Sequence, residues 1–155
     1  MKGHAEVISH LNELLSAELA ARDQYFVQSE MHLDWGFNKL HAHAHREMHE
    51  ETEHAARLIA RILFLEGTPD LSARAAVKVG GDVPSMLSND PEVEVSVTGH
   101  LKEVIAHCES VKGYQTRDIL PGLLKDTEQD HALWLKQQLS LIEQIGLHNY
   151  LQPQT

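Results

Sequence analysis

The stretch EETEHAARLIARILFLEGTPDL, residues 50–71, combines two patterns that together decide the fold. Apolar residues recur at spacings of three and four between Leu58 and Leu65, which predicts a helix with one buried face. Glu51 and His54 fall on that same face, three positions apart, so that one side chain lies above the other. A buried carboxylate is costly unless a partner compensates its charge. This stretch therefore predicts a buried helix that offers two potential ligands to one cavity.

The same Glu-x-x-His spacing returns in DTEQDHALWL, where Glu128 and His131 lie on a second apolar stripe. Two further carboxylates, Glu18 and Glu94, interrupt the apolar stripes of two other segments. The chain thus repeats one order in each half, first a single Glu and then a Glu-x-x-His pair. One such pair on its own is usually part of a solvated face, but four carboxylates on four apolar stripes predict a shared site.

Helical periodicity predicts four long helices, the first over residues 7–34 and the second over residues 37–65. The third is expected to begin near Pro84, and the fourth runs from beyond Gly113 to Gly146. The residues that break helices gather between the second and third segments, at Gly67, Pro69, Gly80, Gly81 and Pro84. We therefore predict one all-α domain over residues 1–155: a four-helix bundle with one long crossover and a short C-terminal helix.

Composition narrows the classes of function. The net charge of −10 argues against binding to nucleic acid, which needs basic clusters, and suits a protein that attracts cations. The start MKGHAEVISH has no apolar signal core, and no apolar run has membrane-spanning length. The lone Cys108 allows no intrachain disulfide and is expected to be a small buried residue. These features predict a cytoplasmic protein that binds neither membrane nor nucleic acid.

The ligand types indicate which metals would bind. Four carboxylates balance the charge of two divalent cations while both histidines stay neutral. Oxygen-rich ligation with one imidazole per metal suits iron or manganese better than copper(I) or structural zinc, which favour sulfur.

With these residues located, the chain resembles the bacterioferritins and related bacterial ferritins along nearly its whole length. The resemblance rests on the ligand set and on MKGHAEVISHLNELLSAELAARDQYF, WGFNKL, EETEHAARLIARILFLEGTPDL, ESVKGYQTRDIL and GLHNYLQ. It implies a ferritin-like bundle that assembles into a hollow shell of twenty-four subunits. It also implies ferroxidase activity, with dioxygen or peroxide oxidising Fe(II), and ferric mineral stored inside the shell.

Carried over to this chain, the resemblance implies two iron ions per subunit. Glu51 and Glu128 would bridge them, Glu18 with His54 would complete one ion, and Glu94 with His131 the other. Tyr25, on the stripe of Glu18, resembles the tyrosine that lies beside the centre in this family. We expect its ring to pack in the core while its hydroxyl hydrogen-bonds to a carboxylate.

The chain departs from the family pattern in two places. Thr52 stands where the family has its haem-ligating methionine, so we expect the homo-oligomer to lack the usual haem. If haem is bound at all, we expect a second type of subunit to bind it. Met48, one turn earlier, is the remaining candidate haem contact. The segment between Asp118 and Glu128 is also one residue longer than is typical and contains Pro121 and Gly122, which predicts a kink or a π-bulge upstream of Glu128. If a local distortion of the helix accommodates the extra residue, Glu128 and His131 should still point inward.

Several alternatives remain open at this point. A DNA-protecting mini-ferritin builds its iron site between subunits, and a peroxide-scavenging protein resembling rubrerythrin usually carries a cysteine-rich iron domain. A metal-free helical assembly module would be better served by leucine than by buried glutamate. The stretch HAHAHREMHE, residues 41–50, is either a solvated face or an auxiliary iron site in which His43 and Glu50 take part.

Overall fold

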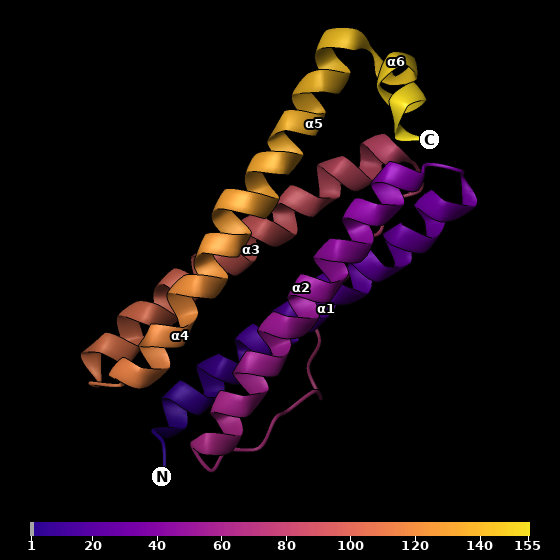
Figure 1. Ribbon diagram of the computed structural model, residues 1–155. Coiled ribbons are helices and arrows are strands. Elements are labelled where there is room, and N and C mark those ends of the chain that lie inside the picture. The colour runs from indigo at the N-terminus through magenta and orange to yellow at the C-terminus, as the bar shows by residue number, and fades with distance from the viewer. Residues whose placement is uncertain (1) are drawn as a thin grey trace.

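The computed structural model describes residues 2–155 and confirms the all-α bundle. Two antiparallel helix pairs make up the bundle (Figure 1). The first pair comprises α1 (Ala5–Asp34) and α2 (Asn38–Phe64). In the second pair, α3 (Val83–Ser110) packs against a long helix in three parts: α4 (Tyr114–Lys125), the π-helix η1 (Asp126–His131) and α5 (Ala132–Ile145). No helix among residues 2–155 combines the length and apolar character needed to cross a bilayer.

A polar stripe on α1 holds the crossover that joins the two pairs. The side-chain amide of Asn12 donates to the carbonyl of Thr68, and the Ser16 hydroxyl donates to the carbonyl of Ala73. Farther along α1, the Gln28 amide donates to the carbonyl of Val79. The crossover therefore follows α1 back along the bundle, as its length predicted.

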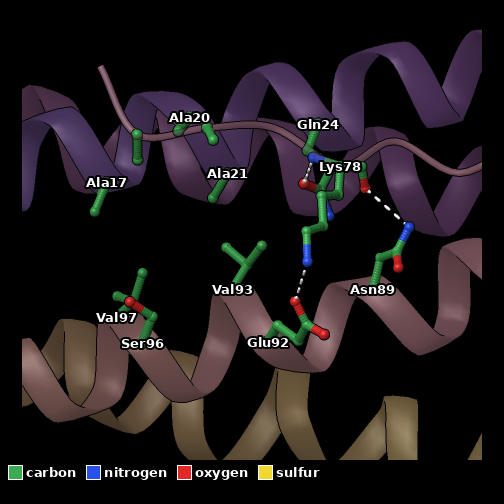
Figure 2. A pocket seen from close by; sticks show the side chains of 12 residues that line it. Ala17, Ala20, Ala21, Gln24, Lys78, Asn89, Glu92, Val93, Ser96 and Val97 are labelled. Atoms are coloured by element: carbon green, nitrogen blue, oxygen red, sulfur yellow. Dashed lines mark hydrogen bonds and ion pairs between the residues drawn. The ribbon is translucent and has the colours of Figure 1, made fainter. Parts of the chain in front are cut away.

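The crossover also forms one wall of a pocket of about 190 Å³ with α1 and α3. Figure 2 shows the small side chains of Ala17 and Ala21 on one side and those of Val93 and Val97 opposite them. Lys78 of the crossover closes one end, where its ammonium pairs with Glu92 at 2.9 Å. Gly80, with φ of +88°, turns the crossover toward α3.

Capping fixes where α3 begins. The side chain of Asp82 accepts a hydrogen bond from the backbone N–H of Ser85, and the Ser85 hydroxyl accepts one from the backbone N–H of Asp82. Pro84 occupies the first turn, where its missing N–H costs nothing. At the other end of the chain, Gly146 ends α5 with φ of +81°, a conformation that favours glycine.

The short helix α6 (Leu147–Leu151), followed by a 3₁₀ turn (Gln152–Gln154), folds back against the bundle. Tyr150 is buried, and its hydroxyl donates to the side chain of Gln138. Its ring belongs to an apolar cluster at this end of the bundle, together with Leu40, Val83, Leu87 and Leu135.

A larger apolar cluster fills the opposite end of the bundle. Its members include Leu11, Leu58, Leu101 and Leu120, one from each of the four long helices, together with the buried Cys108. Between the two clusters, all four helices carry polar residues on their inner faces. The candidate site occupies that middle layer, where apolar packing on both sides limits access of water.

Candidate metal centre

The structure brings five of the six predicted ligands together in the middle layer. Glu18 comes from α1, Glu51 and His54 from α2, Glu94 from α3, and His131 from η1. Each of the five residues is at most 2% exposed. Because these positions are far apart in sequence, it is the antiparallel packing of four helices that assembles the cluster.

Glu51 lies between the two histidines. One of its oxygens, Oε2, is 3.2 Å from Nδ1 of His54, and the other, Oε1, is 3.2 Å from Nδ1 of His131. Glu18 flanks His54 at 3.7 Å, and Glu94 flanks His131 at 3.4 Å. The cluster therefore divides into two half-sites that share the Glu51 carboxylate.

These separations suit metal coordination. Two ligand atoms bound about 2.1 Å from one metal ion lie roughly 3.0 to 3.4 Å apart in octahedral or tetrahedral geometry. Both carboxylate oxygens of Glu18 and Nδ1 of His131 are buried and make no hydrogen bond within residues 2–155. Buried polar atoms normally have a partner, so a bound cation is the simplest one for this donor set.

The outer nitrogens of the two histidines face other carboxylates. Nε2 of His54 is 3.1 Å from Oδ2 of Asp126, while Nε2 of His131 is 2.6 Å from Glu47 and 2.8 Å from Glu50. A carboxylate on the outer nitrogen fixes the orientation of a ligating imidazole and raises its basicity. The sequence did not single out Asp126, although it lies only two residues from the predicted ligand.

Glu128 does not join the cluster, so the expectation that it points inward was wrong. Its side chain is 49% exposed, and its carboxylate accepts a hydrogen bond from the ammonium of Lys102 at 2.7 Å. The neighbouring Thr127 is buried instead, and its hydroxyl donates to the carbonyl of Leu123. The bridging carboxylate on this helix is therefore missing from the cluster as it stands.

The π-helix η1 explains this difference. The extra residue predicted a kink or π-bulge upstream of Glu128. The structure confirms a π-helix, but the π-helix spans Asp126–His131 and so includes Glu128 itself. A single inserted residue would turn every later residue by about 100° in a regular α-helix. The wide turn absorbs that rotation between Asp126 and His131, which keeps His131 inward and turns Glu128 outward.

Tyr25 lies beside the half-site of Glu94 and His131. Its ring is buried, and its hydroxyl donates a short hydrogen bond to Oε1 of Glu94. Burial, reinforced by the negative charge of Glu94, raises the pKa of Tyr25 well above its usual range. The phenol therefore stays protonated and can act as a donor, in agreement with its expected position and hydrogen bond.

The carboxylates of the cluster raise the pKa values of both histidines. Burial disfavours the imidazolium, but Glu18 and Glu51 outweigh it and raise the pKa of His54 to about 11. Burial likewise opposes protonation of His131, whose pKa is nevertheless raised by Glu47, Glu51 and Glu94. Burial and the charge of Glu51 raise the pKa of Glu18. A bound metal ion would therefore compete with protons for these imidazole nitrogens.

A further buried carboxyl group, that of Asp90, lies one turn before Glu94 on α3. Oδ1 of Asp90 accepts hydrogen bonds of 2.7 Å from the side-chain amides of both Gln24 and Gln28. Burial raises the pKa of Asp90 to about 7 despite these two donors. Its position on an otherwise apolar stripe was the signal in the sequence that could have identified it.

The histidine-rich stretch on α2 divides between two faces. His43 stacks on Trp134 with ring centroids 3.5 Å apart, and its Nε2 is 3.6 Å from Glu47 rather than close to Glu50. His41, His45 and His49 form a separate row of neighbouring rings. The alternative of an auxiliary iron site formed by His43 with Glu50 gains no support, since the Glu50 carboxylate contacts His131.

The residues at the haem position do not fit a haem held by two thioethers. Thr52 is exposed, and its hydroxyl donates to the carbonyl of Met48 at 2.8 Å. That hydroxyl is already engaged and is a poor ligand for haem iron. The side chain of Met48 lies a full turn from the expected position, or about 5.4 Å along the helix axis.

Comparisons with known proteins agree with this fold and donor set. The family profile described as a ferritin-like domain matches residues 8–145. Bacterial ferritins of Synechocystis sp. and Pseudomonas aeruginosa are 54% and 53% identical over 154 residues, which is 99% of each chain. A bacterioferritin of Brucella melitensis is 35% identical over 150 residues, covering 97% of this chain and 92% of the relative. On the evidence of these matches and of the bundle itself, the chain belongs to the ferritin family.

Proposed function

We propose that this protein oxidises Fe(II) at a di-iron site within each chain and stores the ferric product inside an oligomeric shell. The observation that carries the proposal is the position of Glu51, whose two oxygens face the Nδ1 atoms of His54 and His131 at 3.2 Å each. A carboxylate shared in this way can bridge two metal ions. Membership of the ferritin family supports iron as the metal.

The substrate would bind as two ferrous ions. Glu18 and His54 would hold one ion, Glu94 and His131 the other, with Glu51 between them. Three carboxylates leave one positive charge of two divalent ions uncompensated, and the nearby Glu47, Glu50 and Asp126 supply further negative charge. These acidic side chains around the site stabilise a higher positive charge on the bound ions, which is what oxidation to two ferric ions produces.

The electrons would pass to dioxygen or peroxide. Four ferrous ions give one electron each to dioxygen, which takes up four protons and leaves as two water molecules. With hydrogen peroxide, two ferrous ions and two protons also yield two water molecules. Tyr25 holds Glu94 in place through its hydroxyl. The apolar clusters on both sides exclude bulk water, so that the carboxylate charges act at low dielectric on the bound ions.

The shell follows from the family resemblance and the cytoplasmic location from the composition, and both are proposed together with the activity. All five assembled ligands belong to one chain, which favours an intra-subunit site over the inter-subunit site of mini-ferritins. Light scattering of the purified protein should give a closed particle of twenty-four chains. A stable monomer or a twelve-subunit particle would contradict this part of the proposal.

The activity is tested by stopped-flow measurement of Fe(II) oxidation. Glu18→Gln and Glu94→Gln should each remove the fast phase, because each takes away one buried ligand while preserving side-chain volume. Glu53→Gln is the matched control, since Glu53 lies between Glu51 and His54 in sequence but is exposed. If both ligand variants kept the initial rate of the control, the di-iron assignment would be wrong.

A further inference from the structure

A second group of histidines and glutamates lies between α1 and α3, outside the buried cluster. His10 and Glu13 belong to α1, His100 to α3, and one ligand atom from each lies within 4.8 Å of the other two. His10 is eight residues before Glu18, which is about 12 Å along the helix axis. This group therefore cannot be a part of the di-iron cluster.

The carboxylate of Glu13 faces both imidazoles. Its Oε2 is 3.2 Å from Nε2 of His100 and 3.7 Å from Nδ1 of His10. Both distances are longer than a good charge-assisted hydrogen bond but close to the roughly 3.4 Å that separates two ligands around one tetrahedral ion. Glu13 is 59% exposed, so its side chain is free to adjust to an ion.

Neighbouring atoms point to a missing partner. Nδ1 of His10 and Nε2 of His107 are both buried from solvent and make no hydrogen bond within residues 2–155. The rings of His10 and His107 are 4.8 Å apart, and Glu6 approaches His107 at 3.6 Å. Imidazole nitrogens that make no hydrogen bond and have only a carboxylate at 3.6 to 3.7 Å are available as metal ligands.

We infer that His10, Glu13 and His100 form a surface site for one divalent transition-metal ion, with Zn²⁺ or Cu²⁺ as the class that fits best. Two imidazoles and one carboxylate match the donor set of open zinc sites, in which water or another ligand takes the fourth position. His107, whose ring centroid lies 4.8 Å from that of His10, is a side chain that could take that fourth position. Copper(II) binds nitrogen and oxygen sites of this kind more tightly than iron(II) does.

Titration of the assembled, metal-free protein with Zn²⁺ by calorimetry tests this site. His100→Gln should lose about one bound ion per chain relative to the wild type, because one of three ligands is removed. His4→Gln, which changes an exposed histidine just before α1, should bind as the wild type does. Equal stoichiometry in all three proteins would overturn the inference.

A second measurement separates this site from the di-iron cluster. Glu18→Gln should weaken zinc binding in the buried cluster but should not change the zinc ion that His100→Gln removes. Crystals soaked in Zn²⁺ should show an anomalous peak between His10, Glu13 and His100, and the peak should disappear in Glu13→Gln. A wild-type map without that peak would refute the site even if the buried cluster were fully loaded.

Discussion

Asp126 contacts the outer nitrogen of His54, with its Oδ2 3.1 Å from Nε2. The inner nitrogen of the same ring faces Glu18 and Glu51, so the imidazole is held from both sides. Asp126 is the first residue of the π-helix, and the wide turn is what places it opposite His54. The fourth helix therefore contributes one carboxylate to this half of the site, behind His54, without offering a direct bridge.

Replacing Asp126 with alanine should weaken metal binding in the half-site of His54. Loss of a carboxylate behind a ligating imidazole typically costs about tenfold to a hundredfold in metal affinity. Titration of the metal-free protein with Co²⁺, followed by its absorption bands, measures the change. Asp130→Ala is the control, since Asp130 is an exposed residue of the same π-helix. Equal affinities in the two variants would show that Asp126 does not support His54.

Glu128 should be dispensable for rapid iron oxidation. Its carboxylate is paired with Lys102 on the outside of the bundle, so Glu128→Gln should change the initial rate by less than about twofold. Glu94→Gln, measured beside it, should lose the fast phase. If Glu128→Gln behaved like Glu94→Gln, the π-helix would have to rearrange when iron binds and turn Glu128 inward.

His32 should make stability depend on pH below neutrality. Burial, followed by the nearby His41, lowers the pKa of His32 to about 4. In the unfolded chain its pKa is about 6.5, so between pH 6.5 and 4 the unfolded state binds a proton that the folded state excludes. The contribution of neutral His32 to the free energy of unfolding is therefore fully present above pH 6.5 and decreases as the pH falls to about 4. The free energy of unfolding changes by at most about 1.4 kcal/mol per pH unit in this range.

Thermal unfolding of His32→Gln across this pH range checks the slope. The variant should lose the component of pH dependence that His32 causes, whatever its absolute stability at pH 7. His4→Gln should keep the wild-type slope, because His4 is exposed. If the slope in His32→Gln equalled that of the wild type, the His32 ring of the wild type would be able to take up a proton in the folded protein.

The purified homo-oligomer should bind haem only weakly. Thr52 lacks the soft sulfur that would ligate haem iron, and its hydroxyl is bonded to the carbonyl of Met48. Haem added to the wild type should wash off during gel filtration, whereas Thr52→Met should retain more of it. Absorption spectroscopy distinguishes the two, and a sharp Soret band with a near-infrared thioether band in the wild type would contradict the prediction.

Helix positions and most of the site could be predicted because they depend on short-range patterns. The spacing of three between Glu51 and His54 lies within one regular helix, so it determines which face both side chains share. Glu18 and Glu94 likewise lie on regular apolar stripes. Glu128 could not be placed in this way, since the π-turn between Asp126 and His131 breaks the period on which the prediction depended.

The contacts across helices were harder to derive. Asp126 and Glu50 reach the outer nitrogens of His54 and His131 only through packing between separate elements, and no local spacing connects them. The buried Asp90 depends in the same way on two glutamines of α1. The grouping of His10 with His100 also joins residues far apart in the chain, so only the folded bundle reveals it.

The π-helix also bears on how ferritins of different lengths can be compared. Chains that differ by one residue in this helix can share every acidic residue type and still bring different carboxylates to the metal. Sequence spacing alone equates Glu128 with a ligand, whereas the residue of this segment that the π-helix buries beside His131 is Thr127. The position of the wide turn, and not the residue type alone, thus decides which side chain of the fourth helix faces the two histidines.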